Sequence, residues 1–188
     1  MAEMLRIAHI IARTEAEGPG VRTAIWTQGC TIRCPGCCNP ELFGATGRRE
    51  WTVDEVVAEV PADVAGITLL GGEPVEQAEG VTALALAIRA RGQTVVLFSG
   101  FTREAIERRA PELLGVLDVL VDGPFVAGRP ESGANEPRRW IGSQNQGLHF
   151  LSDRYGPSDF LGKNTMELRL SGGTVTVNGW PVSRGMGR

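Results

Sequence analysis

Hydrophobic and polar positions along the first two thirds of the chain follow two different periods. Short apolar runs rich in β-branched side chains predict strands. The N-terminal stretch is also apolar, but Glu3, Arg6 and His9 lie within it, so it predicts a further strand rather than a signal peptide. The main predicted strands occupy residues 23–27, 66–70, 94–98 and 116–121.

Segments whose apolar residues repeat with the period of a helix lie between these strands. The clearest helix start is at Thr52, whose side chain can cap the helix while Glu55, three residues later, completes a capping box. This helix should end near Pro61, because proline cannot continue a helix. Two further helices are expected at about 80–91 and 102–109.

The alternation of strands and helices predicts an α/β fold whose strands pair in parallel through right-handed crossovers. The alternation stops after the strand at 116–121. Residues 127–139, rich in Gly, Pro and charge, predict a long loop, and residues 167–170 and 174–177 predict a closing β-hairpin. We therefore expect a single domain over residues 1–188, with a core at about 5–150 and a C-terminal extension at about 151–188.

Composition restricts the class of protein. A chain of 188 residues, 42% hydrophobic, can form one core without disulfides. A net charge of −3 argues against a nucleic-acid partner, which would normally meet a basic face. No apolar run is long enough to span a bilayer, so no membrane partner is expected and a cytoplasmic location follows by default.

The cysteines carry the strongest chemical signal. All four lie between positions 30 and 38, whereas a disulfide framework would spread them along the chain. Cys30, Cys34 and Cys37 form a Cys-x3-Cys-x2-Cys pattern, and three thiolates on one loop can hold three irons of a [4Fe–4S] cubane. The fourth iron then has an open position, which the amine and carboxylate of an amino acid could occupy.

Two other metal sites have to be weighed against this one. A structural zinc site would need a fourth ligand from His9, His149 or Cys38. An electron-carrying cluster would normally need four cysteines, but Cys38 directly follows Cys37, so both can hardly reach one cubane. We expect Cys38 to be a small buried side chain that lines the site.

The segments around the cysteines extend the pattern. The chain resembles the radical S-adenosylmethionine (SAM) superfamily, and more narrowly the glycyl-radical activating enzymes, which activate pyruvate formate-lyase and anaerobic ribonucleotide reductase. One departure is Cys38, because these families usually have an aromatic residue or a histidine at that position. The resemblance runs in order to about Gln146 and begins with segments 17–22 (EGPGVR), 28–30 (QGC), 33–37 (RCPGC) and 39–41 (NPE).

The resemblance implies a small incomplete, partial TIM-like β/α barrel that binds a [4Fe–4S] cluster through Cys30, Cys34 and Cys37 and also binds SAM. Gly71-Gly72-Glu73-Pro74, which directly follows a predicted strand, resembles the family motif whose backbone and acidic side chain hold the SAM amino group. Ser99 ends the next strand, and ligands of parallel sheets gather at such ends. The expected SAM-binding residues are Asn39, Gly71, Gly72, Glu73, Pro74, Ser99 and Asp122. The resemblance implies that Asp122 faces the SAM pocket, in some relatives through a bound cation.

The expected function is reductive cleavage of SAM to a 5′-deoxyadenosyl radical that abstracts a hydrogen atom, with a reduced flavodoxin or ferredoxin as electron donor. The substrate would be a backbone glycine of a glycyl-radical enzyme or, alternatively, a small metabolite in a biosynthetic pathway. Residues 140–146 resemble a segment of the ribonucleotide-reductase activator, but Ile141 and Gly147 replace its arginines. A non-catalytic Fe–S or zinc module is a third alternative.

Overall fold

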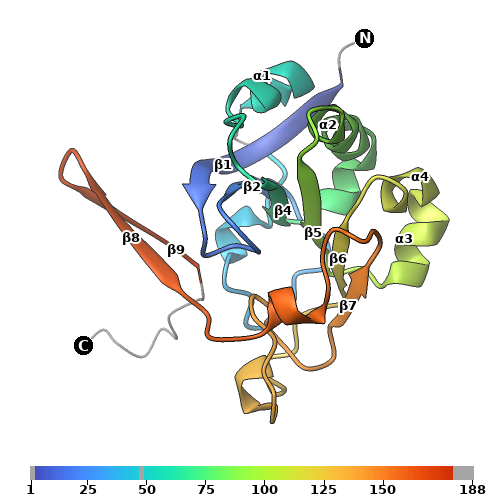
Figure 1. Ribbon diagram of the computed structural model, residues 1–188, viewed down its shortest axis with the longest axis vertical. Helices are drawn as coiled ribbons and strands as arrows, with labels where there is room; N and C mark the ends of the chain where they lie inside the picture. The colour runs from blue at the N-terminus through green and yellow to red at the C-terminus, as the bar shows by residue number, and fades with distance from the viewer. Residues whose placement is uncertain (1–2, 47–48, 180–188) are drawn as a thin grey trace.

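The computed structural model describes residues 3–46 and 49–179. Its main feature is a seven-stranded sheet in the order β3-β1-β2-β4-β5-β6-β7, followed by a separate two-stranded hairpin, β8-β9 (Figure 1). The strands are β1 (Met4–Thr14), β2 (Arg22–Thr27), β3 (Glu50–Thr52), β4 (Gly66–Gly71), β5 (Thr94–Phe98), β6 (Val119–Asp122), β7 (Gly147–Phe150), β8 (Met166–Ser171) and β9 (Thr174–Gly179).

The helices lie mostly between the parallel strands, as the sequence predicts. The α-helices are α1 (Val53–Ala58), α2 (Ala78–Ala90), α3 (Arg103–Arg109) and α4 (Pro111–Leu114). The 3-10 helices are η1 (Pro40–Leu42), η2 (Pro74–Gln77), η3 (Glu131–Gly133) and η4 (Pro157–Phe160).

The sheet is mixed rather than wholly parallel. Strands β2, β4, β5 and β6 pair in parallel, which confirms the prediction for the centre of the sheet. In contrast, β1 is antiparallel to β2 and β3, and β7 is antiparallel to β6, so the expectation of parallel strands is wrong at both sides. The reason on the first side is that a short loop, without a crossover helix, joins β1 to β2, and such a connection reverses the chain direction.

The start of α1 confirms the predicted capping box. The Glu55 amide donates to the Thr52 hydroxyl at 3.2 Å, and the Thr52 amide donates to the Glu55 carboxylate at 2.8 Å. The helix ends at Ala58, before Pro61. The predicted strand at 94–98 coincides with β5, whereas β3, α4 and β7 are short elements that the pattern does not predict.

The two faces of the sheet pack against different layers. Successive side chains of a strand point to opposite faces, so Leu120 of β6 lies on one face while Val119 and Val121 lie on the other. Leu120 belongs to the large core shared with the α-helices, and the opposite face is covered by loop and 3-10 segments. Residues of the opposite face and its cover include Ile11, Ala24, Trp26, Leu42, Val96, Ile141 and Phe160.

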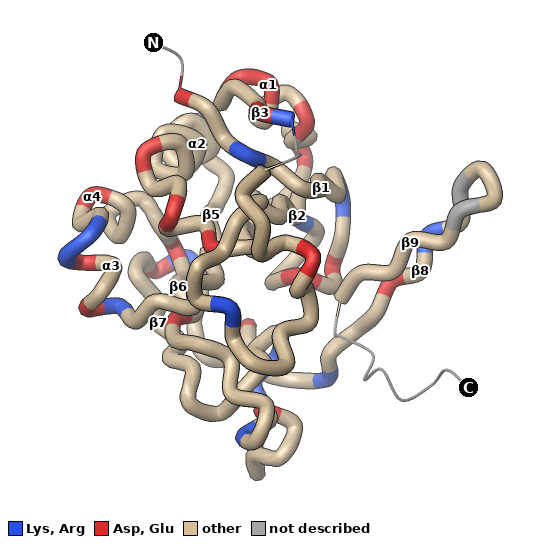
Figure 2. The backbone as a smooth tube through the Cα atoms, turned by 180° about the vertical axis from the view of Figure 1, so that it is seen from behind, with Lys and Arg blue, Asp and Glu red and all other residues tan. Residues whose placement is uncertain are grey.

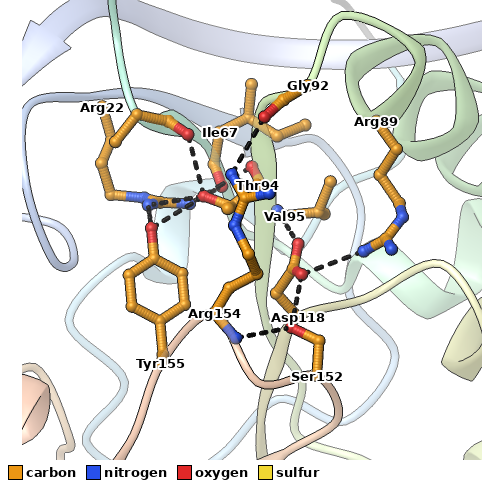
Figure 3. A network of polar contacts seen from close by, with 11 residues as sticks. Arg22, Ile67, Arg89, Gly92, Thr94, Val95, Asp118, Ser152, Arg154 and Tyr155 are labelled. Carbon is orange, nitrogen blue, oxygen red and sulfur yellow. Dashed lines mark hydrogen bonds and ion pairs between the residues drawn. The ribbon is translucent and has the colours of Figure 1, made fainter.

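Arg22 begins β2 and is completely buried at the amino end of the parallel strands. Its guanidinium donates to the Thr68 hydroxyl at 2.9 Å and to the Ile67 carbonyl at 2.6 Å. Nearby, the buried carboxylate of Asp118 accepts from the Val95 amide at 2.8 Å (Figure 3). These polar contacts hold the end of the sheet opposite to the cysteine loop.

The C-terminal hairpin confirms the prediction for residues 167–170 and 174–177, and both strands extend slightly further. Its base contacts the end of β1, where Asn178 donates to the Thr14 hydroxyl at 2.9 Å. The rest of the hairpin stands away from the body of the molecule (Figure 2). One face of it is apolar and exposed, formed by Met166, Leu168, Leu170, Val175 and Val177.

In the part of the chain that the structure describes, no helix has both the length and the apolar character needed to cross a bilayer. Acidic and basic positions are interspersed along the backbone, and Figure 2 shows acidic residues on α1, α2 and α4.

Candidate cluster and cofactor site

The cysteine loop lies at the carboxyl edge of the parallel strands. It follows β2 directly, and the loops after β4, β5 and β6 end at the same edge because these strands run in the same direction. The thiols of Cys30, Cys34 and Cys37 are free and half-buried. Cys38 is also free but exposed, so the expectation of a buried Cys38 is wrong.

The backbone of the loop turns sharply between the cysteines. Arg33 has φ 51° and Gly36 has φ 79°, so one residue in the left-handed region precedes each of the second and third cysteines. The Cys37 amide also donates to the Cys34 carbonyl at 3.1 Å. These turns allow three thiols to be presented from one short loop, as a cubane requires.

The neighbouring thiols influence one another. A hydrogen bond with the Cys38 thiol lowers the pKa of Cys37 to about 6, and burial raises the pKa of Cys30.

Within residues 3–46 and 49–179, no group of three or more His, Cys, Asp or Glu is placed to hold a single metal ion. A cubane differs from such an ion because it distributes its thiolates over several irons.

Gly72 joins the end of β4 to the start of the cysteine loop. Its amide donates to the Thr27 carbonyl at 2.8 Å, and the Glu73 amide donates to the Gly29 carbonyl at 2.8 Å. A Cβ at position 72 would lie 2.3 Å from the Gly29 carbonyl oxygen, so only glycine fits. The Gly-Gly-Glu-Pro segment and the cysteine loop are therefore connected directly through their backbones.

The carboxylate of Glu73 is buried and is bonded from two loops. One oxygen accepts from the Val75 amide at 3.0 Å and from the Ser99 hydroxyl at 2.8 Å, and the other accepts from the Gly100 amide at 2.8 Å. Burial raises the pKa of Glu73 to about 7. The Ser99 oxygen also accepts from the Phe101 amide at 3.0 Å. Glu73, which the resemblance assigns to SAM, thus bonds to Ser99, which its position at a strand end assigns to the same site.

Asp122, the last residue of β6, lies on the helix-covered face. Its carboxylate accepts from the Arg103 amide at 2.5 Å and contacts His149 Nε2 at 2.8 Å. The second histidine, His9, packs against the Trp26 ring with the centroids 5.5 Å apart.

Asn39 precedes the 3-10 helix η1, and its amide donates to the Cys37 sulfur at 3.4 Å. Sequence reasoning did not single out Glu76. Its carboxylate accepts from the Thr31 amide at 2.8 Å and also from the Thr31 hydroxyl. No signal in the sequence would have identified it, because a glutamate in a helical turn is ordinary.

Residues 140–146 hold the polypeptide at the end of β6. The Gln146 side-chain oxygen accepts from the amides of Gly142 and Ser143 at 3.0 and 3.1 Å, and its amide group donates to the Gly123 carbonyl at 3.0 Å. Asn145 donates to the Pro124 carbonyl at 2.8 Å. These side chains therefore support the loop next to the site.

Comparison with known proteins agrees with this arrangement. The chain is 29% identical over 143 residues to the anaerobic ribonucleoside-triphosphate reductase-activating protein of Vibrio cholerae, which covers 70% of this chain and 89% of that protein. The protein of the same name from Enterobacteria phage T4 is 30% identical over 144 residues, covering 72% and 88%. The pyruvate formate-lyase-activating enzyme of Staphylococcus epidermidis is 38% identical over 84 residues, covering 40% and 34%.

The site and these relatives define the chain as a radical SAM enzyme of the activating-enzyme kind, which confirms the resemblance found in the sequence. Residues 16–149 match the family described as the 4Fe-4S single cluster domain. The chain belongs to this family. The match includes the cysteine loop and the sheet from β2 to β7, but the hairpin β8-β9 lies outside it.

Proposed function

We propose that Cys30, Cys34 and Cys37 hold a [4Fe–4S] cluster at which SAM is cleaved reductively. The single observation that carries this proposal is the position of the three free thiols: they lie on one turned loop that is bonded to the Gly-Gly-Glu-Pro segment. Three cysteine ligands would leave one iron for the amino and carboxylate groups of SAM. We further propose that the sheet forms the incomplete barrel expected from the resemblance, within a single domain.

The chain's own residues would bind and orient the cofactor. Gly71, Gly72 and Pro74 bring backbone atoms to the carboxyl edge of β4, where glycine allows close approach of a ligand. Asn39 and Ser99 border the same edge, and Asp122 ends the neighbouring strand. We propose that SAM binds along this edge.

When bound, the cluster and SAM would supply one electron and a 5′-deoxyadenosyl group, giving methionine and a carbon radical that removes one hydrogen atom from the substrate. The protein would exclude water and position the reacting groups. The electron donor would be a reduced flavodoxin or ferredoxin.

We propose a protein substrate, namely a backbone glycine of a partner enzyme, because relatives that the chain matches over most of their length are named as activating proteins of a reductase. One observation favours a second candidate, a small metabolite. Ile141 and Gly147 stand where the ribonucleotide-reductase activator has arginines, and loss of two cations would alter recognition of the same protein partner.

Anaerobic reconstitution with iron and sulfide, followed by dithionite and SAM, tests the chemistry. The expected product is 5′-deoxyadenosine, together with methionine in equal amount. A protein that holds a full cluster yet forms no 5′-deoxyadenosine would contradict the proposal. The variant C34S, prepared in parallel, controls for cleavage by cluster fragments.

Electron paramagnetic resonance then separates the two substrates. We expect a glycyl-radical signal when the reduced enzyme and SAM are mixed with its partner enzyme. If the signal is absent and deuterium from a labelled metabolite appears instead in 5′-deoxyadenosine, the protein-substrate proposal is wrong.

A further inference from the structure

We infer that Glu73 is a positioning residue for the cysteine loop, and that its carboxylate acts on this loop through Ser99 and Gly100. This inference rests on the proposed cluster site. It adds a positioning role to the one implied by resemblance, in which the acidic side chain holds the SAM amino group. The evidence lies in the contacts of the two loops that follow β4 and β5.

Most of the acceptor capacity of the Glu73 carboxylate is used within the protein. A carboxylate has about four acceptor sites, and the amides of Val75 and Gly100 with the Ser99 hydroxyl occupy three of them. Glu73 is 1% exposed and Ser99 is 4% exposed. The carboxylate therefore holds the loop after β5 from inside the protein.

The contacts continue from Gly100 to the cysteine loop. A Cβ at position 100 would lie 2.7 Å from Ile32 Cδ1, so the backbone held by Glu73 packs closely against the segment between Cys30 and Cys34. On its other side, the Glu73 amide holds the Gly29 carbonyl. The Glu73 amide thus contacts the cysteine loop before Cys30. The Glu73 carboxylate supports the same loop after Cys30, through Gly100 and Ile32.

This geometry makes Glu73 and Ser99 one unit. If the carboxylate becomes an amide, one of its two ends carries hydrogens and faces a backbone amide that also donates, so a buried donor loses its partner. If the hydroxyl is removed, Glu73 loses a donor and the Phe101 amide loses an acceptor. Either change releases the β5 loop from its place against Ile32.

The test measures how fast the reconstituted full-length protein loses iron to a chelator under anaerobic conditions without SAM. We expect E73Q and S99A to release iron about tenfold faster than wild type, as loss of a buried hydrogen bond would suggest. S99T, which keeps the hydroxyl, should stay close to wild type. The double variant should be no worse than the more severe single variant, because the two side chains act together.

E79Q, at an exposed glutamate on α2, is the matched control and should behave as wild type. The inference is overturned if E73Q retains iron as wild type does and loses only affinity for SAM, which would make Glu73 a direct ligand. It is also overturned if S99A and S99T release iron equally fast. If E73Q does not fold, the comparison of S99A with S99T still tests the inference. Failure of wild type to bind a cluster would instead refute the proposed function, so the two failures are distinguishable.

Discussion

The Arg22 guanidinium donates to the Tyr155 hydroxyl at 2.8 Å, although 133 positions separate the two residues in the chain. The same hydroxyl lies 2.8 Å from the Thr94 hydroxyl. Burial lowers the pKa of Arg22, and within residues 3–46 and 49–179 its hydrogen-bond partners are hydroxyls and carbonyls rather than carboxylates. The segment after β7 is thus fixed to the first residue of β2, at the end of the sheet opposite to the cysteines.

This contact predicts a loss of stability on substitution. Y155F should lower the free energy of unfolding by about 2 kcal/mol, because it removes a hydrogen bond from a buried cation and also the contact with the Thr94 hydroxyl. R22M should cost more, since the carbonyl of Ile67 and the hydroxyl of Thr68 would also lose their donors. Urea unfolding of the apoprotein measures both changes. R108M, at an exposed arginine of α3, is the control, and equal midpoints for R22M and R108M would contradict the prediction.

The cysteines should differ sharply in their effect on the cluster. Replacing Cys30, Cys34 or Cys37 by serine should abolish stable incorporation of iron, because each would remove one of three thiolate ligands. C38S should retain the cluster, since Cys38 is exposed and directly follows a ligand. Iron and sulfide analysis with the visible absorption spectrum measures this. A C38S protein without a cluster would refute the assignment of three ligands.

The buried carboxyl of Glu73 predicts how stability depends on pH. Burial raises its pKa from 4.5 to about 7, so the folded protein binds a proton between these values where the unfolded chain does not. The free energy of unfolding should therefore decrease as pH rises from 4.5 to 7, by about 3 kcal/mol from this group. Glu17, whose pKa burial also raises to about 7, contributes in the same direction.

Urea unfolding of the apoprotein at several pH values checks this dependence. E73Q should show a smaller decrease than wild type whatever its absolute stability, because glutamine does not titrate. E17Q should remove the other contribution, and E79Q should leave the slope unchanged. A slope in E73Q equal to that of wild type would show that Glu73 does not titrate in this range.

Glu76 supports the cysteine loop from the side of η2. E76A should release cluster iron several-fold faster than wild type, because the Thr31 amide loses its acceptor. E76Q, whose side-chain oxygen can still accept from that amide, should be intermediate. The iron-release assay measures this, with E79A as control. If E76A and E79A release iron at the same rate, the contact does not hold the loop.

Local signals in the sequence predicted a large part of the fold. The Thr52–Glu55 capping box and the strand at 94–98 are set by neighbouring residues, and both occur as expected. β7 escaped prediction because its four half-buried residues show no alternation. The antiparallel pairing of β7 with β6 joins two segments that a long loop separates, and the strand pattern does not contain this contact.

The candidate site also has some features that the sequence predicts and others that it does not. The grouping of Cys30, Cys34 and Cys37 beside the Gly-Gly-Glu-Pro segment follows from sequence spacing and from the parallel order of the strands. The pairing of Glu73 with Ser99 does not, because it requires the side-chain directions of two loops. Asp122 is instructive: it lies two residues after Leu120, and the strand period of two places both on the helix-covered face.

The large sheet ends on each side in a very short strand. β7 has four residues and pairs fully with β6, whereas β3 has three residues and pairs only with residues 4–6 of β1, so among the described residues the rest of β1 has no strand partner on that side. Long open edges invite intermolecular pairing, and brief ones discourage it. When neighbouring molecules meet at high concentration, the β7 edge of the sheet should therefore resist extension by a strand of another molecule.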